Sequence, residues 1–262
     1  MKTRRITIIV LVAIFSLLML YFNLEDTGKL QKKETGEDSK ITTSLSVMGD
    51  KIDAKFSDVS ERFGVDVIDL KDYDLSQCMI AVVIPPKEFR DEEYIGLLNL
   101  LKKVNAKVVI VSTTKEEVIG MLGKEKALPE MLVSELNPAE FDGLVILGGT
   151  GTKNHLWRNK ELEQIVFEFS RYSKPIGAIQ LAPVILANSG IVHGRRMTVY
   201  KSFETLKFLQ SGGVNFLDRG LVIDGNIVTA NGPKMIELFS KTFIVMISEY
   251  MDRKKMEKER NE

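Results

Sequence analysis

Short apolar runs of strand length alternate along this chain with segments of helical periodicity. The runs lie at residues 78–84, 107–111, 144–147 and 176–179. Because they lack the polar alternation of a half-exposed strand, they fit strands buried on both faces, as in a parallel sheet. Strands that alternate with helices form a mostly parallel sheet covered by helices on both faces. We therefore expect an α/β fold built on such a sheet.

The segments around these runs complete the expected order of elements. Asp224-Gly225-Asn226 separates two short apolar runs, 221–223 and 227–229, and predicts a hairpin. A strand at 214–216 is expected to pair with one near 197–200. Apolar residues at helical spacing predict helices at 88–104, 114–122, 158–172, 182–189 and from about 233 to 251.

Three of the expected strands end in loops that should meet. The loops are 87–91, 148–152 and 180–183. In open α/β sheets, ligands bind beyond the carboxyl ends of the strands. The sequence therefore predicts one pocket that these three loops line.

The amino terminus has the pattern of a membrane-targeting segment. Lys2, Arg4 and Arg5 precede an uncharged apolar run at 6–22, which is near the minimum length for a membrane span. The run ends in Tyr21-Phe22, which suit the membrane interface, and no small-residue cleavage site follows. These features favour a signal anchor over a cleaved signal peptide or a buried core helix. The basic residues should stay in the cytoplasm, so the rest of the chain is expected outside it, anchored by one span or, alternatively, secreted after cleavage.

The remaining segments give the expected domain organisation. Residues 1–23 form the anchor or transmembrane helix, and the polar residues 24–50 form a linker, because they contain too few apolar side chains to fold. A helical extension is expected at 51–75, the folded domain at 76–251 and a charged, solvated tail at 252–262.

Composition excludes several kinds of chemistry. The 36 Lys and Arg balance the 36 Asp and Glu, so nothing in the net charge favours nucleic-acid binding. The single cysteine, Cys78, allows no internal disulfide and starts an apolar run, so we expect it to be buried. The two histidines, His155 and His193, are far apart and are expected at the surface. No metal-ligand spacing occurs, and neither a metal nor a cofactor is predicted.

Three runs together resemble a known family. FDGLVILGGTG begins at Phe141, KPIGAIQLAPVILANSGIVHGRRMTVY at Lys174, and GVNFLDRGLVIDGNIVTANGP at Gly213. In order and spacing they are similar to the ThiJ/PfpI family of the class I glutamine-amidotransferase-like superfamily, over residues 78–250. The resemblance implies a flavodoxin-like three-layer sandwich with a mostly parallel sheet, here with the N-terminal membrane helix added. It also implies a cysteine nucleophile at a sharp strand-to-helix turn, a glutamate after the first strand and a nearby histidine.

This chain departs from the family at each of those positions. Gln180 stands where the cysteine is expected, and a carboxamide is not a nucleophile. Leu181 and Tyr200 stand where members carry histidine, and Ala182 replaces a glycine. The acidic position aligns with Arg90. Within one or two residues, the acids that could compensate are Asp91, Glu92 and Glu93.

The glycine-rich loop is the second part of the expected site. Gly148–Thr152 lacks the Gly-Lys-Ser/Thr of a phosphate-binding loop and is interpreted as a tight turn of the family type. The amides of Gly149 and Leu181 are expected to form an anion-binding nest. Trp157 either caps the pocket or packs in the core. The expected ligand-binding residues are Gly149, Thr150, Gln180 and Leu181.

Three functions remain open from the sequence. The first is a tethered pseudoenzyme that binds a small ligand or a protein partner, which loss of the cysteine on an intact scaffold favours. The second is a hydrolase or peptidase, or a glyoxalase or deglycase-like enzyme, in which an acid among residues 91–93 activates water and the glycine-loop amides hold an oxyanion. The third is a structural module that assembles as a homo-oligomer.

Overall fold

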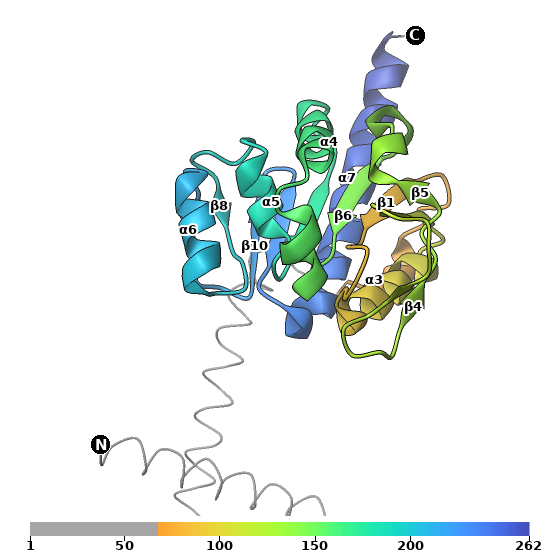
Figure 1. Cartoon of the computed structure of the whole chain (residues 1–262). Helices are drawn as coiled ribbons and strands as arrows, with labels where there is room; N and C mark the ends of the chain where they lie inside the picture. The colour runs from red at the N-terminus through yellow and green to blue at the C-terminus, as the bar shows by residue number, and fades with distance from the viewer. Residues whose placement is uncertain (1–67, 262) are drawn as a thin grey trace, which may run out of the picture. The chain divides into compact units, whose positions relative to one another are not determined.

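A seven-stranded, mostly parallel sheet forms the centre of the folded domain (Figure 1). The structure is a computed structural model and describes residues 68–261. The strand order is β10-β11-β7-β6-β1-β2-β5, and only the β10–β11 pair is antiparallel. The strands are β1 (Met79–Val83), β2 (Lys107–Ser112), β5 (Met131–Leu132), β6 (Gly143–Ile146), β7 (Ile176–Ile179), β10 (Leu221–Asp224) and β11 (Ile227–Ala230).

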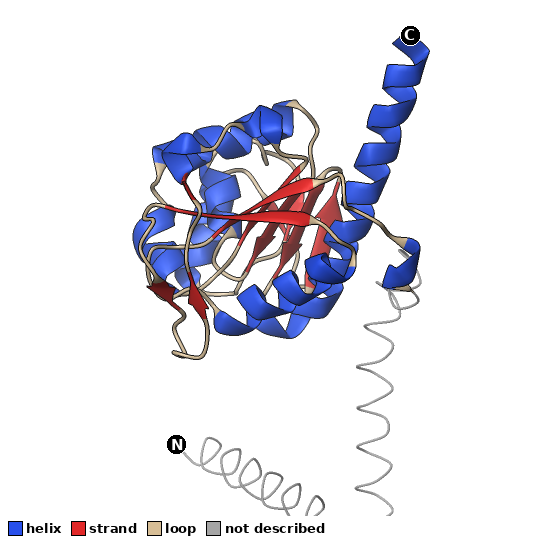
Figure 2. Cartoon of the chain, turned by 90° about the vertical axis from the view of Figure 1, so that its right-hand side faces the viewer, coloured by secondary structure: helices blue, strands red, loops and turns tan. Residues whose placement is uncertain are grey.

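Helices cover both faces of the sheet and give three layers (Figure 2). One face packs against α3 (Asp91–Lys103) and α7 (Ile236–Asn261), and the other against α4 (Lys160–Arg171), α5 (Pro183–Asn188) and α6 (Phe203–Ser211). Alternate residues of β1 enter opposite cores: Ile80 and Val82 face α3 and α7, whereas Ala81 and Val83 face the other side. This period of two explains why an uninterrupted apolar run is required for a strand buried on both faces.

Smaller elements connect these layers. Two short pairs flank the sheet: antiparallel β3 (Val118–Ile119) with β4 (Lys126–Ala127), and parallel β8 (Arg196–Met197) with β9 (Asn215–Phe216). Single 3-10 turns and one π-helical turn occur at Leu70–Asp72, Val133–Glu135, Pro138–Glu140, Pro233–Met235 and Thr152–Leu156.

Most predicted elements are confirmed, and three differ. The helix expected at 114–122 is wrong: this segment contains β3 and a loop with Gly120 and Gly123. Val118 and Ile119 pair with Ala127 and Lys126 instead, and Asp91 accepts backbone N–H groups of the loop between the two strands. A Cβ on Gly120 in this loop would lie 2.4 Å from an Asp91 oxygen. The helix expected from residue 88 begins at Asp91, because Glu88 has a positive φ of 54°.

The C-terminal helix is longer than expected. It runs through Asn261 instead of ending near residue 251, so the charged tail is helical, although residues 252–260 are exposed. Figures 1 and 2 show its last turns projecting beyond the other helices.

The N-terminal expectations are not tested by this structure. The anchor, the linker and the first part of the helical extension, up to residue 67, lie outside the described residues. Within residues 68–261, no helix combines the length and the apolar character that a membrane span needs.

Candidate functional site

Gln180 occupies a sharp turn between β7 and α5. Its φ is +60°, a left-handed conformation that costs a residue with a side chain about 1 kcal/mol or more. Two hydrogen bonds hold its backbone there: its N–H donates to the Ala230 carbonyl at 2.9 Å, and its carbonyl accepts the Tyr200 N–H at 2.8 Å. Pro183 then begins α5 at a helix position where no N–H is needed. The strand-to-helix turn that the sequence implies is therefore present, with a glutamine at its apex.

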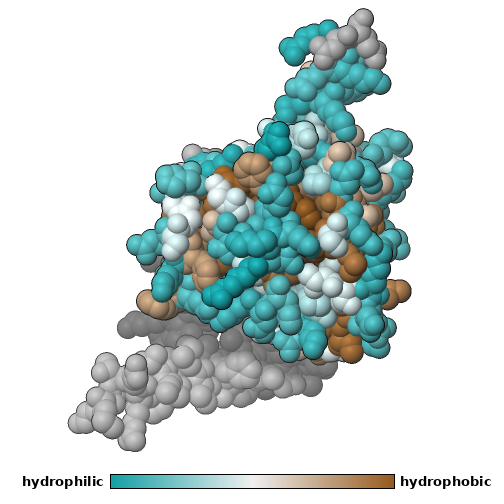
Figure 3. Space-filling model, turned by 45° about the horizontal axis from the view of Figure 1, so that its top comes forward, coloured by the Kyte–Doolittle hydropathy of each residue, from teal (hydrophilic) through white to brown (hydrophobic). Residues whose placement is uncertain are grey.

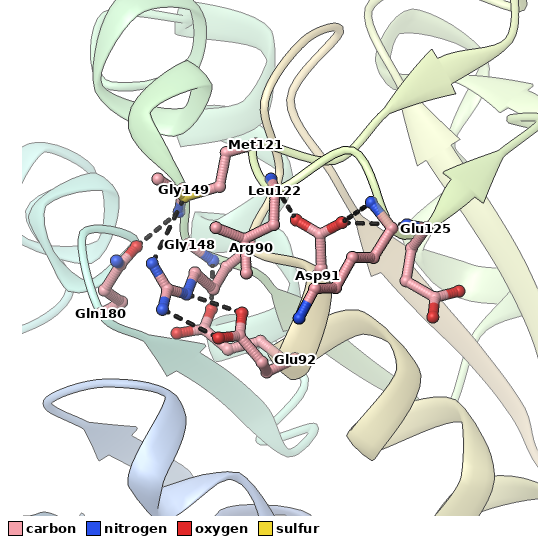
Figure 4. Close-up of polar contacts among 11 residues, drawn as sticks. Arg90, Asp91, Glu92, Met121, Leu122, Glu125, Gly148, Gly149 and Gln180 are labelled. Carbon is pink, nitrogen blue, oxygen red and sulfur yellow. Dashed lines mark hydrogen bonds and ion pairs between the residues drawn. The ribbon is translucent and has the colours of Figure 1, made fainter.

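The side chain of Gln180 turns back onto the glycine-rich loop (Figure 4). Its Oε1 accepts the Gly149 N–H at 2.5 Å. Gly149 has φ +119°, and a Cβ there would lie 2.2 Å from the Glu88 carbonyl oxygen, so only glycine fits. The amide expected to belong to an anion nest thus already binds the carboxamide oxygen of this chain.

Glu93 is the acid that lies beside Gln180. Its Oε2 accepts the Gly148 N–H at 2.9 Å, and a Cβ added to Gly148 would lie 2.3 Å from Gln180 Oε1 and 2.9 Å from Glu93 Oε2. The side chains of Gln180 and Glu93 therefore both pack directly against the backbone of Gly148. Glu93 has no exposed surface, and its Oε1 makes no hydrogen bond to any of the described residues.

Burial makes Glu93 a weak acid. Loss of solvent raises its pKa to about 8, against smaller lowering effects of the Gly148 N–H and the Arg90 guanidinium, while Glu92 adds a small raising effect. The carboxyl group is therefore protonated at neutral pH. Protonated, it can donate one hydrogen bond and accept others beside Gln180.

The other candidate acids have different partners. Asp91 accepts N–H groups from Leu122, Lys124 and Glu125 at 2.8–2.9 Å. Burial raises the pKa of Asp91, but these N–H groups outweigh it, and the net pKa lies below the ordinary value. Figure 4 shows Asp91 directed toward this loop and away from Gln180, so its carboxylate holds the loop in place.

Arg90 and Glu92 form a pair next to the site. Arg90 Nε lies 2.8 Å from Glu92 Oε2, and its Nη1 lies 3.6 Å from the sulfur of Met121. The Arg90 backbone N–H donates to the Gly148 carbonyl at 3.0 Å. Arg90 stands where the family resemblance implies an acidic residue. Its backbone holds the glycine-rich loop, and its side chain pairs with Glu92.

The remaining expected residues lie around this centre. Thr150 Oγ1 donates to Glu88 Oε2 at 2.6 Å, which joins the glycine-rich loop to the loop after β1. Tyr200 is 52% exposed, and it contacts the site through its backbone N–H, which donates to the Gln180 carbonyl. Trp157 is buried, and its Nε1 donates to the Leu181 carbonyl at 2.8 Å, so it packs in the core and also fixes the turn.

Three further expectations concern residues outside the site. His155 and His193 are exposed, as predicted. Cys78 is buried, and burial, with the nearby Asp142 carboxylate, raises its thiol pKa to about 11. Within the described part of the chain, no group of three or more His, Cys, Asp or Glu side chains could hold a metal ion.

The position of Glu93 could have been inferred from periodicity. Glu93, Leu97, Leu100 and Val104 recur at three and four residues, which places the glutamate on the buried face of α3. Alignment to the family motif placed the acidic position at Arg90 instead. Such an alignment is less accurate in a loop than in a helix, and Arg90 lies in the loop before α3.

A three-layer α/β sandwich in which β7 runs into a strained turn, facing a glycine amide and a buried glutamate, defines a protein built on the nucleophile-elbow plan. The chain belongs to the DJ-1/PfpI family, whose model matches residues 79–246.

Individual relatives agree with this family. A protein of Methanocaldococcus jannaschii described as uncharacterized is 41% identical over 165 residues, covering 63% of this chain and 80% of that protein. The deglycase PfpI of Pyrococcus furiosus is 29% identical over 169 residues, covering 64% of this chain and 99% of that protein. A solved ThiJ/PfpI domain protein of Brachyspira murdochii superposes with a TM-score of 0.62 at 27% identity, covering 67% of this chain and 98% of that one.

Proposed function

We propose that this chain is a non-catalytic member of its family, a pseudoenzyme that binds a small ligand or a protein partner at the turn that carries Gln180. One observation carries the proposal: a carboxamide stands at the apex of the turn, and its oxygen binds the Gly149 amide. A carboxamide cannot attack a carbonyl group. In addition, the amide that would stabilise a developing oxyanion is bound by the chain itself. Both requirements for acyl or carbonyl chemistry by a nucleophile are therefore missing.

The surroundings of Gln180 support binding rather than turnover. The Glu93 carboxyl group is protonated at neutral pH, so it offers a hydrogen-bond donor and no charge. A ligand with a carbonyl or carboxamide group could replace the Gln180 oxygen at the Gly149 amide. Such a ligand would recover one hydrogen bond for each that it breaks.

A paired activity assay tests this proposal. The wild type, Gln180→Cys and Gln180→Asn are each assayed with methylglyoxal and with a peptide substrate. Wild type and the asparagine variant should be inert, whereas the cysteine variant should gain activity, because the turn presents a thiol beside the glycine amide. Turnover by the wild type would contradict the proposal.

A second candidate function is an enzyme of altered mechanism, as a hydrolase, peptidase or deglycase-like protein. The observation that favours it is the buried Glu93, whose pKa of about 8 suits a general acid or base near neutral pH. The relatives named deglycases make this chemistry the natural one to assay. If the wild type is active, Glu93→Gln should abolish the activity, whereas Glu92→Gln should retain it.

We further propose that residues 6–22 anchor the chain in a membrane, with the folded domain outside the cytoplasm. The uncharged run behind three basic residues supports this arrangement. Protease added to intact cells should then digest the domain, and the chain should stay with the membrane at alkaline pH. A mature N-terminus beyond residue 22 would instead support cleavage and secretion.

Self-association is proposed as a further property. Phe203 and Leu128 are 88% and 67% exposed, and burial of either side chain against a second copy of the chain would be favourable. Light scattering of the purified chain should give a mass above that of one chain. A mass of one chain at all concentrations would contradict this property.

A further inference from the structure

A polar groove lies at the edge of the sheet opposite Gln180. Pro175 immediately precedes β7 and lines the groove, whereas Gln180 immediately follows the same strand. At about 3.3 Å per residue, the strand alone separates the two places by roughly 13 Å. The groove has a volume of about 620 Å³, which falls within the range of small-molecule sites. Its lining residues are Ser173, Pro175, Arg195, Asp224, Gly225, Asn226, Met246, Glu249 and Arg253.

The Arg195 side chain is held in place by the β10–β11 turn. Its Nη1 donates to Asn226 Oδ1 at 3.1 Å and approaches the Asp224 carbonyl oxygen at 3.5 Å. Asn226 is fixed in turn, because its Nδ2 donates to the Lys174 carbonyl at 2.8 Å. The Nε and Nη2 groups of Arg195 make no hydrogen bond to any residue in the range 68–261. A guanidinium group fixed on one side with donors left over is prepared for a planar or tetrahedral oxyanion.

The opposite wall of the groove is α7. Met246, Glu249 and Arg253 recur at three and four residues and so share one face of this helix. Arg253 is exposed and makes no ion pair within the described residues, not even with Glu249 one turn earlier. It can therefore approach a ligand in the groove from the side opposite Arg195.

The groove also contains two carboxylates, Asp224 and Glu249, which differ in how far they offset the charges of Arg195 and Arg253. Asp224 Oδ2 accepts the backbone N–H of Arg196 at 3.0 Å and pairs with its Nε at 3.2 Å, so Arg196 is its main cationic partner and Arg195 a weaker one. Glu249 is exposed at the groove and makes no hydrogen bond or ion pair to the described residues. Figure 3 views the molecule from the side on which the end of α7 projects, and hydrophilic residues cover most of that face.

We propose that this groove is a second binding site, for a small molecule that carries a carboxylate or phosphate group. Arg195 and Arg253 hold the oxyanion from the two walls, and Ser173 adds a hydroxyl group. A hydrogen-bond donor elsewhere on the ligand faces Glu249. Gln180 does not line this groove, so a test of this site does not depend on the proposed function.

Equilibrium dialysis of the full chain tests the proposal, with radiolabelled inorganic phosphate and radiolabelled succinate as separate probes at low ionic strength. At least one probe should bind saturably, at one molecule per chain and with a Kd of about 1 mM or below. Arg195→Gln and Arg253→Gln should each weaken binding about tenfold, because each removes a charge-assisted hydrogen bond. Binding of phosphate alone would assign a phosphate ligand, and binding of succinate alone a carboxylate.

Two further variants separate recognition from a change in folding. Glu249→Gln should strengthen the binding of either anion, since it removes a repulsive charge, and a merely structural effect would not do so. Arg158→Gln removes an exposed arginine outside the groove and should leave binding unchanged. The proposal is overturned if neither anion binds saturably, or if the double variant Arg195→Gln/Arg253→Gln binds as well as the wild type.

Discussion

Replacement of Glu93 by glutamine should remove a strong pH dependence from the stability of the fold. The carboxyl group has no exposed surface and accepts the Gly148 N–H at 2.9 Å. Glutamine has the same shape, keeps an oxygen for that N–H and carries no proton that titrates. The variant therefore imitates the protonated wild type at every pH.

The magnitude follows from the difference between the folded and unfolded states. The pKa of Glu93 is about 8 in the folded domain, against an ordinary value of 4.5. Between these pH values the folded state binds more protons than the unfolded state, so stability falls as pH rises. The favourable contribution is fully present below pH 4.5 and is lost as pH rises through about 8. At 1.36 kcal/mol per pH unit, the loss amounts to about 5 kcal/mol.

Urea unfolding from pH 5 to pH 9 measures this effect. Trp157 is the single tryptophan of the chain and is buried, so its fluorescence reports unfolding of the domain. Wild type and Glu93→Gln should have similar free energies of unfolding at pH 5. At pH 9 the variant should be the more stable of the two by several kcal/mol.

A matched control is Glu163→Gln. Glu163 is also poorly exposed, but Lys160 pairs with it at 2.7 Å, so the control should keep the wild-type slope. Parallel pH profiles for wild type and Glu93→Gln would refute the reasoning. They would mean that Glu93 does not hold a proton in the folded domain at neutral pH.

Three other substitutions test the supports of the site. Asp91→Ala should destabilise the domain by roughly 3 kcal/mol in urea unfolding, because three loop amides lose a charged acceptor. Because the pKa of Asp91 is lowered in the folded domain, the stabilisation by the wild-type carboxylate should be present above about pH 4 and lost as pH falls. Gly149→Ala should lower Tm by the equivalent of roughly 3 kcal/mol, because its Cβ would lie 2.2 Å from the Glu88 carbonyl oxygen, and an unchanged Tm would contradict this. Trp157→Phe should cost about 1 kcal/mol through loss of the bond to the Leu181 carbonyl, measured by calorimetry, with little change expected from the exposed control Tyr200→Phe.

Strand positions were predictable from the sequence, because burial on both faces leaves an uninterrupted apolar run. β7 occupies residues 176–179 as expected, and the β10–β11 hairpin turns at Asp224-Gly225-Asn226. The pairing of β8 with β9 also followed from the sequence.

Segments held by a distant side chain were less predictable. The loop at 120–125 is organised by Asp91, which lies about thirty residues earlier. A contact with a residue so far along the chain does not affect the local sequence pattern, so the apolar residues of 114–122 were interpreted as a helix. The end of α7 was missed for a different reason, because the charged residues at 252–260 fit both a helix and a solvated tail.

Within the candidate site, the sequence identified the loops that carry Gly149 and Gln180 as neighbours. Gln180 and Gly149 were both expected to line the pocket, and they are hydrogen-bonded. The sequence could not show that the carboxamide oxygen of Gln180 accepts the Gly149 N–H. That contact depends on the Gln180 rotamer, and the motif contains no information about it.

The backbone at Gln180 is fixed by groups that lie far away along the chain, the Ala230 carbonyl and the Tyr200 N–H. Its left-handed conformation therefore does not depend on the side chain that it carries. A replacement at this one position would present a new functional group in the same direction, against the same glycine amide. In evolution, a lineage could lose or regain a nucleophile by a single substitution, without rebuilding the fold around it.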